Sequence, residues 1–254
     1  MKLSALASLA SDCVAARAWM PALLRLTGPF RLAETIRLPE PLRLRLDAWR
    51  ALPSPPPNAP FQTQRWVVAD TETSGLDPRA HRLLSIGALG LTRLRVDLAD
   101  GFDTVLRQTH PSTHANILIH GIGEQAQRDG EDAQLALIRF LEFTGKAPLI
   151  AYHAPFDAAF VRRAMRTHLG FAPALPWLDL AVLLPALFDA RSERALDGWL
   201  LRFGILPPVR HSALGDALAT AQLAQIALHQ AASLGLLHFA ALKKLHGAAR
   251  WLPP

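Results

Sequence analysis

The chain has 254 residues, enough for one large domain or for one domain with an extension. Half of the residues are hydrophobic and 19% are charged, which excludes a disordered, highly charged polymer. The net charge of +6 favours a polyanionic partner.

The single cysteine excludes an internal disulfide framework, and no apolar stretch reaches membrane-spanning length. We therefore expect a cytoplasmic protein without a membrane contact. No secretory leader is expected, because Asp12 and Arg17 interrupt the first apolar residues.

Composition divides the chain into four parts. Residues 1–52 predict a helical extension, and the proline-rich residues 53–60 predict an extended linker. A folded domain is expected over residues 61–232, followed by a tail over residues 233–254 that is either a frayed end or a contact for nucleic acid. The extension has too many apolar residues for a free tail, so we expect it to pack on the domain, on a second copy or on another protein. These residues are Leu3, Leu6, Leu23, Leu24, Leu26, Leu32 and Ile36.

Within the domain, the hydrophobic pattern predicts both strands and helices. Apolar runs predict strands over Arg65–Ala69, Leu83–Leu94, Asp103–Gln108 and Leu149–His153. Helical spacing predicts helices over Gly130–Thr144, Ala158–His168, Leu178–Phe188, Leu196–Phe203 and Ser212–Ser233. Three strands, a helix, a strand and further helices imply an α/β fold in which a mixed sheet is flanked by helices.

Two acids stand at the end of the first apolar strand. Asp70 and Glu72 are two residues apart, so their side chains point to the same face of a strand. Carboxylates this close repel one another unless a cation lies between them. Hard oxygen ligands suit Mg²⁺ or Mn²⁺ better than Zn²⁺. Alone, the pair also fits a strand that ends in a solvated acidic turn.

Two later segments favour the metal site. A second apolar strand is followed by Asp157, and a long apolar helix opens with His211 and Asp216. Four acids and one histidine, on three separate segments, therefore form a candidate site. Alone, His211 would fit a surface histidine beside the start of a helix.

These segments resemble the motifs of the DEDDh family of 3′–5′ exonucleases, which includes the proofreading epsilon subunits of bacterial DNA polymerase III. The resemblance covers residues 61–232 and rests on Asp70–Leu76, Arg82–Ala88, Ile119–Ile122, Ala154–Asp157 and Arg210–Ala217. Three positions depart from the family pattern: Ser85 replaces a usual Glu, Tyr152-His153 replaces a common His-Asn, and Gly123 replaces a Thr or Ser. None of these departures removes a metal ligand or the base.

The resemblance implies a ribonuclease H-like fold and catalysis with two divalent cations, Mg²⁺ or Mn²⁺. By the family pattern, Asp70 would bridge both ions, and Glu72 and Asp216 would hold the ion beside the attacking water. Asp157 would serve the second ion. His211 would take the proton from the water, which suits its ordinary pKa near 6.5. Asp179 resembles a residue that starts a helix, so we expect it to be structural.

Candidate substrate contacts surround the first motif. A backbone amide of the loop Thr71–Leu76 and the Leu76 side chain would lie against the terminal nucleotide, whose base needs an apolar or stacking surface. The predicted contacts are Thr71, Thr73, Gly75, Leu76, His120 and Phe156. For Phe156, a place in the core is an equal alternative.

The sequence therefore predicts a metal-dependent enzyme that releases nucleoside monophosphates from single-stranded DNA 3′ ends, in proofreading or repair. An RNA or oligoribonucleotide 3′–5′ exonuclease is an open alternative. A third hypothesis is a non-catalytic, polymerase-associated module that binds nucleic acid. A DNA polymerase or a second copy of the chain is the expected protein partner.

Overall fold

The computed structural model describes residues 36–56, 58–190, 195–206 and 211–249. The helices predicted before residue 36 lie outside these residues. Within the described part of the chain, no helix is long and apolar enough to cross a membrane.

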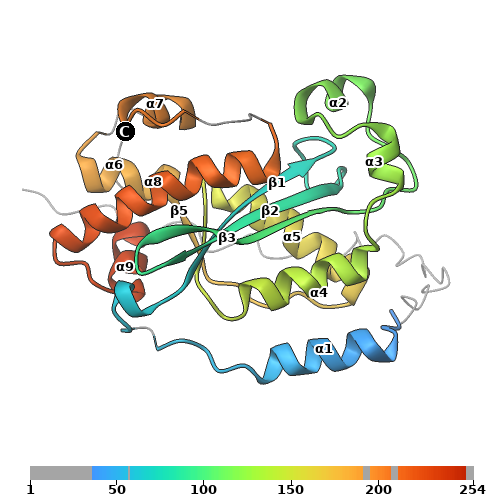
Figure 1. The fold of residues 1–254 in the computed structure, drawn as a ribbon, viewed down its shortest axis with the longest axis horizontal. Coiled ribbons are helices and arrows are strands. Elements are labelled where there is room, and N and C mark those ends of the chain that lie inside the picture. Colours follow the sequence, from blue (N-terminus) through green and yellow to red (C-terminus); the bar gives the residue numbers. More distant parts are fainter. Residues whose placement is uncertain (1–35, 57, 191–194, 207–210, 250–254) are drawn as a thin grey trace, which may run out of the picture. The chain divides into compact units, whose positions relative to one another are not determined.

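A mixed sheet forms the centre of the fold, as predicted, and it has five strands where the sequence predicted four (Figure 1). Its order is β3-β2-β1-β4-β5, with β1–β2 and β2–β3 antiparallel and β1–β4 and β4–β5 parallel. The strands are β1 (Trp66–Thr73), β2 (Leu83–Thr92), β3 (Arg95–Val105), β4 (Leu149–Ala151) and β5 (Trp177–Asp179). Nine α-helices are assigned among the described residues, and they flank the sheet. They are α1 (Glu40–Ala51), α2 (His114–His120), α3 (Glu124–Arg128), α4 (Ala133–Thr144), α5 (Ala154–Leu169), α6 (Leu180–Phe188), α7 (Leu196–Arg202), α8 (Ala213–Ser233) and α9 (Phe239–Ala249).

Each face of the sheet is covered by its own apolar core. Trp66 and Val68 of β1 pack in the core beneath α6, α7, α8 and α9. Val67 and Ala69, which alternate with them, pack in the core formed with α1, α4 and α5. Burial on both faces explains why the β1 sequence is a continuous apolar run instead of an alternating one.

Three features differ from the sequence prediction. Strand β3 begins at Arg95, whereas the sequence predicted a strand from Asp103. It is an exposed edge strand with few apolar residues, and it is held by its pairing with β2. Strand β5 has only three residues and was included in the predicted helix over Leu178–Phe188. The predicted frayed end is instead ordered as helix α9, whose Leu242 is 1% exposed in the core. The ring of Phe239 lies 6.0 Å from that of Trp66.

Helix α1 packs on the sheet domain through α4. Its Leu46 and Trp49 are buried, and the Trp49 indole Nε1 donates a hydrogen bond of 2.7 Å to the carbonyl of Gly145. Arg45 forms a paired hydrogen bond with the exposed carboxylate of Glu142. The helix belongs to the compact unit Ile36–Pro254. The domain boundary proposed at residues 53–60 remains a prediction.

Replacing Trp49 with alanine should lower the free energy of unfolding by about 3–5 kcal/mol, the usual loss when a buried aromatic ring is removed. Arg45→Ala, on the same helix, should cost less than about 1 kcal/mol because its ion pair is exposed. Urea denaturation followed by circular dichroism measures both values. Equal, small losses would show that α1 does not stabilise the domain.

Candidate functional site

The alternation of side chains along β1 decides where its acids point. Trp66 and Val68 face the core beneath α8, and continuing the alternation places Asp70 and Glu72 on the same side. Thr71 lies between the two acids and faces α5. The strand thus presents two carboxylates to α8 just beyond the apolar core.

A glycine in β2 lets α8 approach the sheet closely. Gly87 pairs with Asp70 across the β1–β2 ladder. A Cβ atom at position 87 would lie 2.2 Å from the backbone of both Ala213 and Leu214, in the first turn of α8. The absence of a side chain therefore allows this turn to rest on the sheet, where it delivers Asp216 to the two acids of β1.

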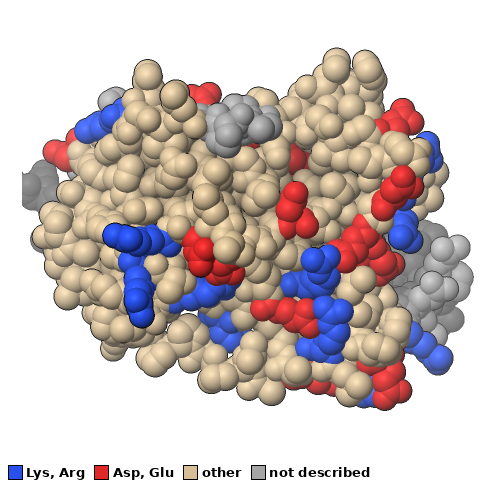
Figure 2. All heavy atoms as spheres, viewed as in Figure 1, with Lys and Arg blue, Asp and Glu red and all other residues tan. Residues whose placement is uncertain are grey.

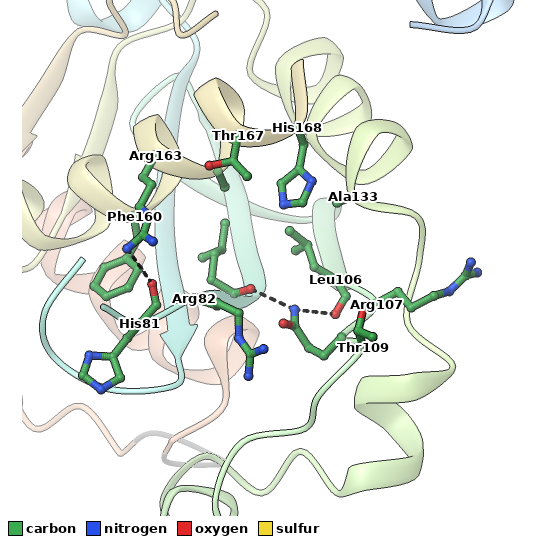
Figure 3. A pocket seen from close by; sticks show the side chains of 13 residues that line it. His81, Arg82, Leu106, Arg107, Thr109, Ala133, Phe160, Arg163, Thr167 and His168 are labelled. Carbon is green, nitrogen blue, oxygen red and sulfur yellow. Dashed lines mark hydrogen bonds between the residues drawn. The ribbon is translucent and has the colours of Figure 1, made fainter. Parts of the chain in front are cut away.

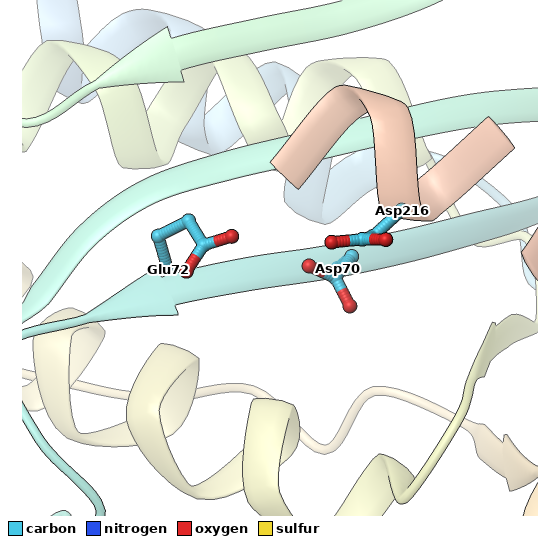
Figure 4. Close-up of side chains that lie close together, drawn as sticks. All are labelled: Asp70, Glu72 and Asp216. Carbon is cyan, nitrogen blue, oxygen red and sulfur yellow. The ribbon is translucent and has the colours of Figure 1, made fainter. Parts of the chain in front are cut away.

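Asp70, Glu72 and Asp216 form a candidate metal centre (Figure 4). One carboxylate oxygen from each residue lies within 4.8 Å of the others. Asp216 is buried and the other two side chains are partly exposed, so the cluster has access to solvent on one side. Oxygen ligands in this arrangement fit a hard divalent cation.

The electrostatics of the cluster also fit a cation. Burial, and then the negative charge of Asp216, raises the pKa of Glu72 to about 7. Without a counter-charge, the folded protein therefore resists ionisation of all three carboxylates. A bound divalent cation would remove this penalty and return Glu72 to its ionised form.

This raised pKa predicts a pH-dependent stability. Glu72 has an ordinary pKa of 4.5 and a folded pKa of about 7, so between these values the folded state binds more protons than the unfolded state. The free energy of unfolding contributed by Glu72 consequently falls as pH rises through this window. Without divalent cations, Glu72→Gln should be more stable than the natural protein near pH 8, and this advantage should vanish near pH 4.

Thermal melting in a chelator across this pH range measures the difference. Burial lowers the pKa of His120 and His168, which gives the opposite slope below about pH 6.5. These histidines are present in the natural protein and in Glu72→Gln. The difference between the melting temperatures of the two proteins therefore reports the effect of Glu72 alone. A difference that does not change with pH would contradict the raised pKa.

Asp157 lies on the other side of β1 from the three clustered acids. It is 3% exposed in the first turn of α5, and its Oδ1 accepts a hydrogen bond of 2.8 Å from the Thr71 hydroxyl. Burial raises the pKa of Asp157 to about 7, and the hydrogen bond with Thr71 partly offsets this effect. Asp157 is linked to the cluster through Thr71, but it is not among the three residues whose oxygens converge. Its predicted part as a fourth ligand remains a prediction.

His211 lies directly before α8 and is tied to the metal cluster by its backbone. Its N–H donates a hydrogen bond of 2.8 Å to Oδ2 of Asp216. The residue has a φ of 58°, a left-handed conformation that is uncommon outside glycine, and it is exposed. This arrangement keeps the histidine backbone beside a candidate ligand while the residue remains accessible. Its predicted part as the base is consistent with this position and remains a prediction.

The loop after β1 presents one apolar side chain to solvent. Leu76 is 83% exposed, whereas Thr73 is buried and its hydroxyl donates to the carbonyl of Gly75. Gly75 has a φ of 154°, and a Cβ there would lie 2.3 Å from the ring of His81. Thr73 and Gly75 therefore shape the loop, and Leu76 is the predicted substrate contact that is most accessible.

Three of the predicted substrate contacts have partners within the protein. The Thr71 hydroxyl is buried against Asp157, and the partly buried Phe156 packs against the core beside Phe160. His120 is 3% exposed, and both of its ring nitrogens have partners. Its Nε2 lies 2.9 Å from Oδ1 of Asn116, and its Nδ1 accepts from the N–H of Ile122. These contacts show what holds the three side chains in place, and their predicted part as substrate contacts remains a prediction.

Asp179 has the structural role predicted for it. Its Oδ1 accepts hydrogen bonds from the N–H groups of Ala181, at the start of α6, and of His153, at the start of α5. Gly87, in contrast, was missed as a positioning residue. A glycine inside an apolar strand is a recognised signal of close backbone approach, but the sequence does not reveal which element approaches.

The family is decided by the match of residues 67–224 to a family model described as exonuclease. The chain belongs to the exonuclease family. The predicted resemblance to DEDDh exonucleases is confirmed.

Several relatives carry the names of bacterial DNA polymerase III proteins. A DNA polymerase III subunit epsilon-like protein of Rhodobacter capsulatus is 33% identical over 186 residues, which are 72% of this chain and 26% of the relative. The DNA polymerase III subunit epsilon of Rickettsia conorii is 30% identical over 166 residues, 63% of this chain and 71% of the relative. The chain thus spans about a quarter of the R. capsulatus protein and most of the Rickettsia one.

A solved structure of E. coli exonuclease I in complex with a dT13 oligonucleotide shares the fold of this exonuclease domain. The two superpose with a TM-score of 0.59 at 18% identity, covering 68% of this chain and 42% of exonuclease I. The predicted ribonuclease H-like fold is confirmed by this likeness.

Proposed function

We propose that the protein is a two-metal-ion 3′–5′ exonuclease that removes nucleoside monophosphates from single-stranded DNA 3′ ends. The observation that carries this proposal is the convergence of Asp70, Glu72 and Asp216. The backbone N–H of His211 donates a hydrogen bond to the carboxylate of Asp216. A non-catalytic module would have no need to maintain three carboxylates whose mutual repulsion is costly without a cation.

Each residue of the site has a task in this proposal. Asp70, Glu72 and Asp216 would hold a divalent cation, Mg²⁺ or Mn²⁺, and Asp157 would serve a second ion. When bound, such ions activate water and neutralise charge on the phosphate. His211 would accept the proton of the attacking water, and Leu76 would support the terminal base.

DNA is the proposed substrate because the relatives carry the names of DNA polymerase III subunits and the structural neighbour was solved with a dT13 oligonucleotide. The same names support a DNA polymerase as partner and the cytoplasm as location. A homodimer is the alternative assembly, and size-exclusion chromatography coupled to light scattering separates the two.

Matched single strands of DNA and RNA, labelled at the 5′ end, test the proposed function directly. With Mg²⁺ or Mn²⁺, the DNA strand should yield a ladder that shortens from the 3′ end, and a chelator should abolish it. Faster degradation of the RNA strand would instead assign an RNA exonuclease. If neither strand is shortened, the proposed exonuclease activity is contradicted.

A further inference from the structure

A cavity of about 310 Å³ lies on the sheet face that α4 and α5 cover (Figure 3). Its apolar part is formed by Leu83, Leu106 and Phe160, which belong to the core on that face. The cavity is separate from the cluster of Asp70, Glu72 and Asp216, which faces α8. Its volume is in the range of cavities that bind small ligands.

The polar part of this cavity is positively charged. Arg82, Arg107 and Arg163 line it together with two histidines and two threonines, and none of its lining residues is acidic. Figure 3 shows that the Arg107 side chain extends away from the other lining residues, so the guanidinium groups of Arg82 and Arg163 are the charged groups beside the apolar wall. Two such groups and two threonine hydroxyls match a ligand that carries both an anionic group and an apolar group.

The three arginines are held by backbone carbonyls and not by acids. Arg82 donates to the carbonyl of His110, Arg107 to that of Gly130, and Arg163 to that of His81. Among the ion pairs between described residues, none involves these arginines. Carbonyl bonds fix the orientation of a guanidinium without neutralising it, so the positive charge remains for an external anion.

The cavity adjoins the strand that carries the acids. Leu83 pairs with Thr73, the last residue of β1, and Arg82 and Ser74 exchange two hydrogen bonds of 2.9 Å. Only the loop between these residues separates the end of β1 from the cavity, and this loop carries the exposed Leu76. A polynucleotide with its 3′ end at the acids would pass this loop to reach the arginines.

Figure 2 shows that charged side chains gather over the lower half of the face in view, whereas most of the area over α7 and α8 is uncharged. Electrostatic attraction of a polyanion therefore depends on particular arginine groups and not on an evenly basic surface.

We propose that this cavity binds an internal nucleotide of the substrate strand, upstream of the 3′ end. The base would lie against Leu83, Leu106 and Phe160, and the phosphodiester against Arg82 and Arg163. This inference rests on the proposed function. An acidic peptide with an apolar side chain has similar chemistry, but the direct continuity with the acid-bearing strand favours the polynucleotide.

A double variant, Arg82→Gln with Arg163→Gln, tests the proposal. Anisotropy of a labelled twelve-nucleotide DNA strand, measured in a chelator, should show about tenfold or greater loss of affinity. The slope of log affinity against log salt should fall by about 1.4, since each phosphate contact of a single strand contributes about 0.7. The matched control is Arg93→Gln with Arg95→Gln, two exposed arginines at the far end of β2 and β3.

Hydrolysis of the p-nitrophenyl ester of thymidine 5′-monophosphate, which is too short to reach the cavity, should be unchanged in both double variants. Failure of the natural protein to cleave this ester would count against the proposed function and not against the cavity.

Circular dichroism shows whether the variants fold. If they do not, the natural protein still gives an answer: its salt slope should be smaller for a dinucleotide than for the longer strand. Equal losses in both double variants, or no loss in either, would overturn the proposal. A salt slope that does not depend on strand length would also overturn it.

Discussion

Replacing Asp70 with asparagine should lower hydrolysis of single-stranded DNA by about 10³-fold or more. A catalytic cation supplies several kcal/mol of transition-state stabilisation, and each 1.4 kcal/mol corresponds to about tenfold in rate. Asp70 is one of the three residues whose carboxylate oxygens converge at the candidate metal centre, so its neutral analogue removes a ligand while keeping the shape of the side chain. Steady-state hydrolysis and isothermal titration with Mn²⁺ measure activity and cation binding in parallel.

Asp97→Asn is the matched control for this variant, because Asp97 is an exposed acid on the edge strand β3. It should leave both measurements unchanged. Asp70→Asn should also melt no lower than the natural protein in a chelator, because it removes repulsion between carboxylates. Divalent binding that is the same in Asp70→Asn and in the natural protein would exclude the cluster as the metal centre.

Replacing His211 should lower the turnover rate by about 10²–10⁴-fold, the usual loss when a general base is removed. The choice of variant matters because His211 has a left-handed backbone conformation. Asparagine tolerates this conformation better than alanine and has no basic nitrogen near neutral pH. His211→Asn therefore tests the imidazole while retaining the backbone hydrogen bond to Asp216.

Cation affinity distinguishes the two roles that His211 could have. A base gives a loss of turnover with unchanged Mn²⁺ affinity, and the acidic limb of the pH–rate profile should change with it. A parallel loss of cation binding would make His211 a ligand. His229→Asn, in an exposed position on helix α8, provides the control and should alter neither quantity.

The geometry of the acids on β1 could be predicted because it depends on local rules. Alternation along a strand is sufficient to place Asp70 and Glu72 on one face, and their convergence with Asp216 agrees with this rule. The order of acids along the chain indicated the family, and the family indicated the fold. Strands β1, β2 and β4 and helices α4 to α8 followed from apolar periodicity.

Burial of polar side chains could not be predicted in the same way. The sequence did not indicate that the His120 ring nitrogens have partners at Asn116 and Ile122. The partners of a buried polar group come from segments whose packing is decided by tertiary structure. Edge strand β3 was misplaced for a related reason, since its pairing with β2 holds a segment with little apolar character of its own.

Gly87 has a consequence for how the site adapts to ions of different radius. The first turn of α8 rests on the backbone of β2, with no side chain between them that could change rotamer. Asp216 therefore cannot retreat from Asp70 by a small movement of its helix without losing this contact. Glu72 has one more rotatable bond than either aspartate, and its strand partner Ser85 is small. The Glu72 side chain therefore makes most of the adjustment to a larger or smaller ion, whereas Asp70 and Asp216 keep their positions.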